Sequence, residues 1–232
     1  MQRLLGIVGG LSPYSTIVYY KEINELYRKK TGEYPELLLA SISVDRVCSL
    51  VRSGDLDGLA GYVYSAVSRL ERGGAEGFLI AANTPHLVAD RISSMAKIRF
   101  LNILDSVYRD VERIGARRIG LLAAKETVES RLYHDYFEKR GVEVIEPSRP
   151  GLEIVEKIVE SVVNGLIGPD YRLKLASVAN SLIARGAQAV VLGCTELPIV
   201  FQGVRLPVPV IDSVHSHVRD AVEFMMGEGE EA

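Results

Sequence analysis

The same short pattern occurs twice in this chain, and it limits the possible folds more than any other feature. Residues 184–198 read ARGAQAVVLGCTELP, and residues 72–86 read RGGAEGFLIAANTPH. Each copy reads as a helix end, a glycine turn, a short apolar strand and a small or polar tip. When the two turns are aligned, Ala82 falls on Cys194. Such a repeat predicts two similar α/β halves facing each other across a cleft, each delivering one strand tip to it.

Apolar runs suited to buried strands alternate along the chain with segments of helical period. We expect two three-layer α/β/α halves with mainly parallel sheets, related by a pseudo-twofold axis. Residues 1–100 form the first half and residues 101–212 the second, and a C-terminal helix at 213–226 packs back across both. Strands are expected at 4–8, 37–42, 78–82, 119–123, 142–145, 189–192 and 208–211. Helices are expected from Ser12 onward and at 56–71, 87–95, 106–114, 133–140, 153–163 and 171–184, with 44–53 a loop or short helix and 125–127 a turn.

Composition excludes several classes of protein. The 27 basic and 30 acidic residues are scattered along 232 positions and give a net charge of −3, which argues against a nucleic-acid partner. No apolar run approaches the ~20 residues of a membrane span, and the N-terminus lacks the pattern of a signal peptide. Two cysteines and four histidines form no metal motif, so we expect no metal site. We therefore expect a cytoplasmic protein.

Cys194 is the first candidate for a functional residue. It directly follows the apolar run Ala189–Leu192 and Gly193, at the carboxyl end of a strand, where open α/β sheets bind ligands. The amides of Thr195 and Glu196 are expected to point back at the sulfur and lower its pKa, or the Glu196 carboxylate to meet a substrate ammonium group. We expect Cys194 to be the reactive thiol and Cys48 to be a packed or half-buried one.

The other repeat and the first helix supply polar candidates. Asn83 and Thr84 offer donors at the tip of the first strand copy. Ser12 before Pro13 is a helix start signal, and a helix N-terminus after a glycine turn favours an anion. The alternative for that segment is a well-capped connecting turn. His86 is interpreted as a histidine satisfied locally at a helix start rather than as a catalytic base.

Three segments, GIVGGLSPYST, AANTPH and LGCTELP, resemble the aspartate/glutamate racemase superfamily, and GCTE resembles its aspartate racemase branch. The resemblance implies an amino-acid racemase that works without pyridoxal phosphate, binds a small amino acid or dicarboxylate and forms a homodimer. Members of the family carry one cysteine before the Asn-Thr pair and another in the GCT motif. Here Ala82 stands in the first of these positions, so the implied acid/base role rests on Cys194.

The resemblance also implies residues that bind the substrate. A basic residue near position 46 holds a carboxylate in the family, for which Arg46 is the first candidate and Arg52 the second. Thr127 matches a threonine common in members, where its hydroxyl binds carboxylate. Asn164 replaces a lysine that members acting on aspartate use as a cation, so acidic substrates lose one attraction here.

Inversion at Cα requires proton removal on one face and delivery on the other, and the methyl group of Ala82 can deliver none. Three interpretations follow for an enzyme. The chain is a racemase whose first cysteine was replaced to trap a ligand, a natural homologue with altered or lost racemase activity, or a single-base enzyme like the arylmalonate decarboxylase relatives with one cysteine. A fourth is a binding protein that senses a small dicarboxylate or amino acid without turnover.

Overall fold

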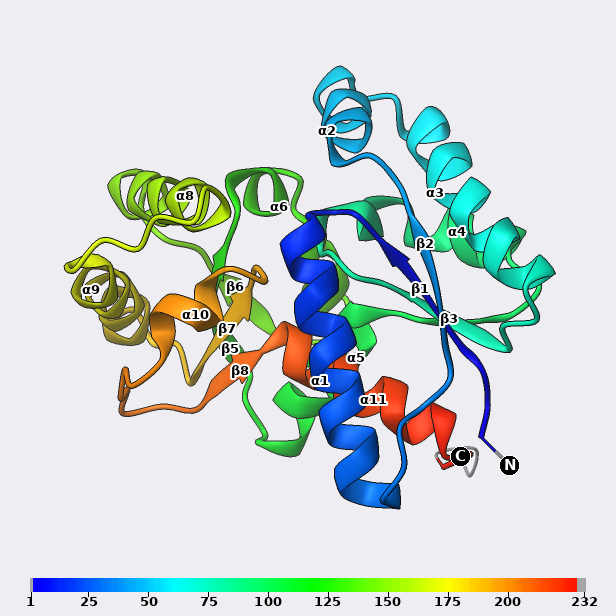
Figure 1. The fold of residues 1–232 in the computed structure, drawn as a ribbon. Helices are drawn as coiled ribbons and strands as arrows, with labels where there is room; N and C mark the ends of the chain where they lie inside the picture. The colour runs from blue at the N-terminus through cyan, green and yellow to red at the C-terminus, as the bar shows by residue number, and fades with distance from the viewer. Residues whose placement is uncertain (1, 229–232) are drawn as a thin grey trace. The chain divides into compact units, whose positions relative to one another are not determined.

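The computed structural model describes residues 2–228. Two compact units make up the described part of the chain, one of residues 2–103 with 217–228 and the other of residues 104–216 (Figure 1). Each unit has its own four-stranded parallel sheet and its own hydrophobic core. In the described part of the chain, no helix is long and apolar enough to cross a membrane.

The first unit is built on the sheet β2-β1-β3-β4. Its strands are β1 (Leu5–Gly9), β2 (Leu37–Ser41), β3 (Gly77–Ile80) and β4 (Arg99–Leu101). Its helices are α1 (Pro13–Thr31), α2 (Val44–Ser53), α3 (Leu56–Arg72), the 3-10 helix η1 (Thr84–Val88), α4 (Ala89–Met95) and α11 (Ser213–Met225) from residue 217 onward. Every residue of β1 and β3 is buried, as continuous apolar runs in a parallel sheet require.

Two glycines of β1 show how helices cover both faces of this sheet. A Cβ atom at Gly6 would lie 2.8 Å from the Leu70 side chain of α3, and one at Gly9 would lie 2.5 Å from the Thr16 side chain of α1. Because side chains alternate along a strand, these positions point to opposite faces. The sheet is therefore the middle of three layers, with α3 on one side and α1 on the other.

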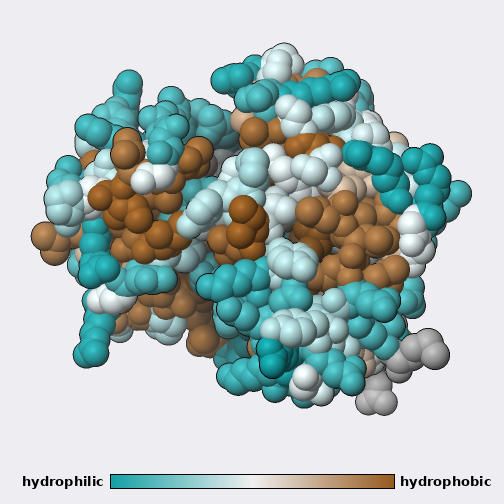
Figure 2. All heavy atoms as spheres, viewed as in Figure 1, coloured by the Kyte–Doolittle hydropathy of each residue, from teal (hydrophilic) through white to brown (hydrophobic). Residues whose placement is uncertain are grey.

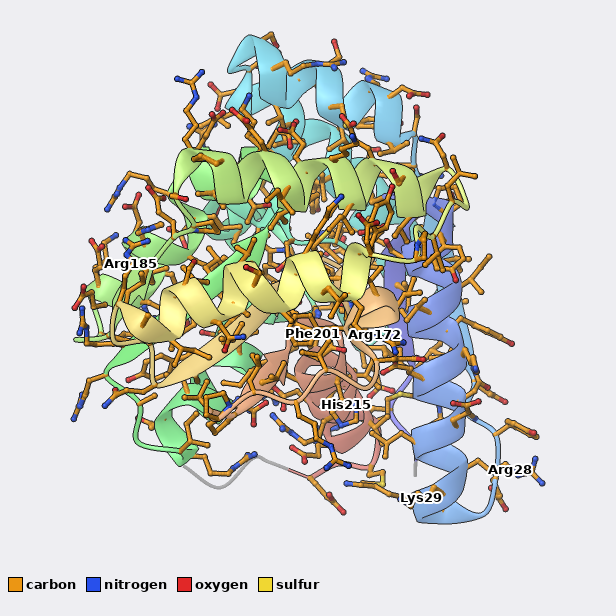
Figure 3. The ribbon with its side chains drawn as sticks, turned by 90° about the vertical axis from the view of Figure 1, so that its left-hand side faces the viewer. Arg28, Lys29, Arg172, Arg185, Phe201 and His215 are labelled. Atoms are coloured by element: carbon orange, nitrogen blue, oxygen red, sulfur yellow. The ribbon has the colours of Figure 1, made fainter. Side chains whose placement is uncertain are left out.

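The second unit repeats this plan with the sheet β6-β5-β7-β8. Its strands are β5 (Arg118–Ala123), β6 (Glu143–Ile145), β7 (Ala189–Gly193) and β8 (Val210–Asp212). Its helices are α5 (Ile103–Arg113) from residue 104 onward, α6 (Lys125–Glu129), α7 (Leu132–Glu138), α8 (Arg149–Val163), α9 (Tyr171–Ala184) and α10 (Leu197–Phe201). Phe201 is buried in the core beside α9 and so fixes the end of α10 (Figure 3).

The strand order confirms the internal repeat. β3 and β7 hold the same place in their sheets, each beside the first strand of its unit. The aligned turn residues Gly74 and Gly186 both have positive φ, +91° and +98°, a conformation that favours glycine. The expected class, two parallel sheets flanked by helices, is confirmed.

Three local expectations were wrong. Residues 125–127, expected as a turn, begin the helix α6. The third strand ends at Ile80 rather than at residue 82, so Ala82 lies in the loop that follows it. Helix α8 starts at Arg149 rather than at residue 153, because Ser148 stands at its N-cap and Pro150 suits its first turn.

Candidate active site

The strand orders define where a ligand site is expected in each unit. From β1 the chain continues to β2 on one side and later returns to β3 on the other, and β5 stands in the same relation to β6 and β7. The place between the two central strands where the chain order reverses is called a switch point. In open α/β sheets, ligands bind there, beside the carboxyl ends of the two strands. In the first unit these ends lead to Ser12 and Ala82, and in the second to Thr127 and Cys194.

Cys194 follows β7 and forms a hydrogen-bonded group with the next two residues. Its Sγ donates to Oε2 of Glu196 at 2.9 Å, and Oγ1 of Thr195 donates to the same oxygen at 2.7 Å. The exposed fractions of Cys194 and Glu196 are 8% and 5%. Two donors on one buried oxygen hold the carboxylate against the thiol. The sequence analysis predicted that Cys194, Thr195 and Glu196 act together, but it did not predict a hydrogen bond from the thiol to the Glu196 carboxylate.

The pKa of the Cys194 thiol is raised well above its ordinary value, because the group is buried and the charge and hydrogen bond of Glu196 oppose a second negative charge. Backbone hydrogen bonds from Glu196 and Ala124 act in the opposite direction but are outweighed. The expected lowering of the thiol pKa is therefore wrong, because the pKa is raised instead. A protonated thiol needs an acceptor for its proton before it can act as a base.

Tight packing fixes the position of the thiol. A Cβ atom at Gly193 would lie 3.0 Å from the Leu121 side chain and 3.4 Å from the Tyr133 ring, so only glycine fits there without displacement. Tyr133 is fully buried, its hydroxyl bonds the Ser213 side chain, and burial raises its pKa. The sequence placed Tyr133 in a helix but gave no signal that it lies near Cys194.

The tip of β3 carries a methyl group where the aligned tip of β7 carries the thiol. Ala82 is 8% exposed, and its amide donates to the Ile80 carbonyl at 2.8 Å. Asn83, 6% exposed, and Thr84 follow it, the latter as the first residue of η1. The first unit thus offers amide and hydroxyl groups at this strand end, and no thiol.

His86 is a structural residue, as its interpretation from sequence proposed. Its Nδ1 donates to the Asn83 carbonyl at 3.1 Å, and its Nε2 accepts from the Ile103 amide at 3.4 Å. Complete burial, followed by the neighbouring His217, lowers its pKa to about 3. A neutral imidazole with both nitrogens engaged serves to hold the loop that contains Asn83.

Ser12 caps α1, as expected. Its Oγ accepts from the Ser15 amide at 3.3 Å and lies 3.1 Å from the Ser15 hydroxyl. Thr16 closes the turn, because its Oγ1 accepts from the Gly10 amide at 2.8 Å and donates to the Ser12 carbonyl at 3.0 Å. The turn after β1 therefore presents a half-buried hydroxyl group at the start of a long helix.

The remaining sequence candidates are more scattered. Arg46 is exposed on α2, where its guanidinium lies 4.2 Å from the centre of the Tyr62 ring, and Arg52 is exposed on the same helix. Thr127 is buried in α6. Asn164 is exposed at the C-cap of α8, where its Nδ2 donates to the Glu160 carbonyl at 2.8 Å.

Cys48 differs from its prediction. It is exposed on α2, because the neighbouring Val47 and not Cys48 faces the core. Cys48 is thus the exposed thiol and Cys194 the buried one. Among residues 2–228, no three His, Cys, Asp or Glu side chains gather as ligands for a metal ion.

Comparisons with known proteins identify chains and folds that are similar to this one. The profile of the Asp/Glu/Hydantoin racemase family matches residues 8–221. A broad specificity amino-acid racemase of Bacillus subtilis is 21% identical over 90% of this chain and 92% of its own. The crystal structure of an aspartate racemase homologue from Pyrococcus horikoshii superposes with a TM-score of 0.85 at 31% identity, covering 97% of this chain and all of that one. Glutamate racemase from Francisella tularensis, solved with D-glutamate, has the same fold at 17% identity and a TM-score of 0.68, covering 100% of this chain and 85% of that one.

Proposed function

Because the chain belongs to the Asp/Glu/hydantoin racemase family, we propose that it moves the α-proton of a small amino acid such as aspartate or glutamate, with Cys194 as the base and without pyridoxal phosphate. The observation that carries this proposal is the hydrogen bond from the Cys194 thiol to the buried carboxylate of Glu196, at the carboxyl end of β7. A buried cysteine with a purely structural role does not need a carboxylate as a hydrogen-bond partner.

Glu196 supplies the acceptor that the protonated thiol lacks. The thiol proton passes to the carboxylate, which leaves a thiolate and a neutral carboxylic acid. The thiolate then takes the proton from Cα, and the electron pair of the broken C–H bond remains on the substrate, spread over Cα and its carboxylate. Hydrogen-bond donors beside that carboxylate stabilise the developing charge. For this role we propose Thr127 and Thr195, which belong to the same unit as Cys194. We propose Ser12, Arg46, Asn83, Thr84 and Asn164 as further residues that bind the substrate.

Ala82 limits what this chemistry can achieve. With one thiol, the proton returns to the face from which it came, and the substrate regains its original configuration. Exchange of the α-proton with solvent is then faster than inversion. The buried methyl of Ala82 also favours a second candidate, decarboxylation of a substituted malonate, because that reaction needs protonation on one face only.

Deuterium exchange at Cα tests the proposal directly. L- and D-aspartate and L- and D-glutamate are incubated with the chain in D2O, and loss of the α-proton signal is followed by NMR. We expect exchange in one enantiomer, abolished in Cys194→Ser and retained in Cys48→Ser, the matched change at the other thiol. Exchange that persists in Cys194→Ser would contradict the proposal. Binding by calorimetry without any exchange would identify a binding protein instead.

A further inference from the structure

A buried cluster of polar side chains lies in the interior of the first unit. Its members are Tyr19 on α1, His86 on η1 and His217 on α11, with exposed fractions of 0%, 2% and 0%. The outward side of α1 is apolar over its first half (Figure 2), and Ile17 is 63% exposed there. Tyr19 lies two positions further on, so it faces the opposite way. Polar groups shielded from water need hydrogen-bond partners within the protein, and these partners show what the cluster holds.

His217 joins α1 to the end of β4. Its Nε2 lies 2.8 Å from the Leu101 carbonyl oxygen, which can only accept, so Nε2 is the donor. In a neutral imidazole Nδ1 then carries no proton, and it accepts from the Tyr19 hydroxyl at 2.9 Å. The two rings also meet edge to face, with their centres 5.6 Å apart. α1 is therefore attached to β4 through Tyr19 and His217.

His86 joins the loop after β3 to the same place. Its Nδ1 donates to the Asn83 carbonyl, and its Nε2 accepts from the Ile103 amide. Residues 101–103 end β4 and begin α5, so one short segment anchors both histidines. The centres of the two imidazole rings lie 6.1 Å apart. Their bonding partners require opposite tautomers, with the proton on Nε2 of His217 and on Nδ1 of His86.

Both attached segments carry residues of the proposed site. Ser12 lies at the start of α1, about 10 Å along the helix from Tyr19 at 1.5 Å per residue, and Asn83 is held by His86 through its own carbonyl. We propose that Tyr19 and His217 are positioning residues, which fix the start of α1 relative to the loop of Asn83. This inference rests on the proposed function, in which Ser12 and Asn83 bind the substrate.

The tautomers test the hydrogen bonds of the cluster. Proton–nitrogen correlation spectra of the full chain identify the protonated ring nitrogen of each histidine, and His217→Gln and His86→Gln assign the two signals. Near neutral pH we expect the proton on Nε2 of His217 and on Nδ1 of His86, and a changed Nδ1 shift of His217 in Tyr19→Phe. A His217 ring protonated on Nδ1, or an Nδ1 shift that Tyr19→Phe leaves unchanged, would overturn the inference.

The kinetics of α-proton exchange test the positioning role. Tyr19→Phe removes only the hydroxyl group, and KM for the exchanged amino acid should rise roughly 10-fold, the order expected for one lost hydrogen bond. The kcat should not change, because Cys194 and Glu196 belong to the other unit. The matched control is Ile23→Val, which removes one methyl group from the same buried side of α1 and should change neither constant. A fall in kcat without a rise in KM, or an equal rise in Ile23→Val, would contradict the positioning role.

Backbone amide exchange separates this inference from the proposed function. If the parent chain exchanges no α-proton, the proposed function fails, but mass spectrometry of amide exchange still shows whether the pair holds α1. Tyr19→Phe and His217→Phe should each speed exchange in residues 10–16 relative to the parent chain and to Ile23→Val. The double variant should be no faster than His217→Phe alone, because both changes remove the same hydrogen bond. Unchanged exchange in residues 10–16, or additive effects in the double variant, would overturn the inference.

Discussion

The thiol of Cys194 and the carboxylate of Glu196 lie 2.9 Å apart in a buried setting, so the protonation of one controls that of the other. Replacing Glu196 by glutamine removes a negative charge that raises the thiol pKa. The pKa of Cys194 should fall, and the pH at which iodoacetamide begins to label it should move downward. Because an amide cannot accept the thiol proton, deuterium exchange at Cα should fall in the same variant.

In Glu196→Gln, we therefore expect iodoacetamide labelling of Cys194 to begin at lower pH while deuterium exchange at Cα becomes slower. Glu129→Gln, which neutralises an exposed carboxylate on α6, is the matched control and should change neither. Labelling of the exposed Cys48 gives an internal reference in each sample. A labelling profile that does not move, or exchange that is undiminished, would show that Glu196 does not control the thiol.

At the level of elements, the N-terminus of α1 combines a structural role with a proposed binding role. Ser12→Ala removes the cap on the Ser15 amide and should lower the free energy of unfolding by about 1 kcal/mol. It should also weaken substrate binding, because the hydroxyl beside the helix N-terminus is lost. Denaturant unfolding and calorimetric titration measure the two effects.

Asp55 provides the matched control for this prediction. It caps α3 by accepting from the Gly58 amide at 2.8 Å, so Asp55→Ala should cost similar stability. Neither Asp55 nor Gly58 is among the proposed binding residues, and the change should leave substrate affinity unchanged. If both variants lose affinity equally, the effect of Ser12 is on stability alone.

The elements were largely predictable from sequence because their signals are local. The glycine turns, the apolar runs of β1 and β7 and the Ser-Pro start of α1 each specify their own conformation. The short helix at Lys125–Glu129 was missed, since its five residues offer too little periodicity to distinguish a helix from a turn. The site was harder to foresee: the bond from Cys194 to Glu196, the approach of Tyr133 to Gly193 and the capping role of Asn164 are side-chain choices that only packing decides.

On the scale of the whole molecule, the chain consists of two units with the same strand order but different strand tips. β7 leads to Cys194 and β3 to Ala82, at positions that the internal repeat makes equivalent. Both positions are buried in the cores of their units, so each needs a small side chain, and alanine and cysteine both meet that requirement. The difference between the tips therefore concerns chemistry more than folding.

Restoring the second thiol tests whether Ala82 limits racemisation. Ala82→Cys should raise the rate of interconversion of L- and D-aspartate or glutamate, measured by chiral chromatography, by roughly 10²–10⁴-fold, the usual contribution of a positioned general acid. Ala82→Ser is the matched control, because it adds an atom at the same place without an acidic thiol. Deuterium exchange in the parent chain should continue at a rate set by Cys194. Rapid racemisation by the parent chain would contradict the two-base account. If Ala82→Cys does not racemise faster than the parent chain, the missing thiol is not what limits racemisation, and the loss of a cation at Asn164 is the alternative cause.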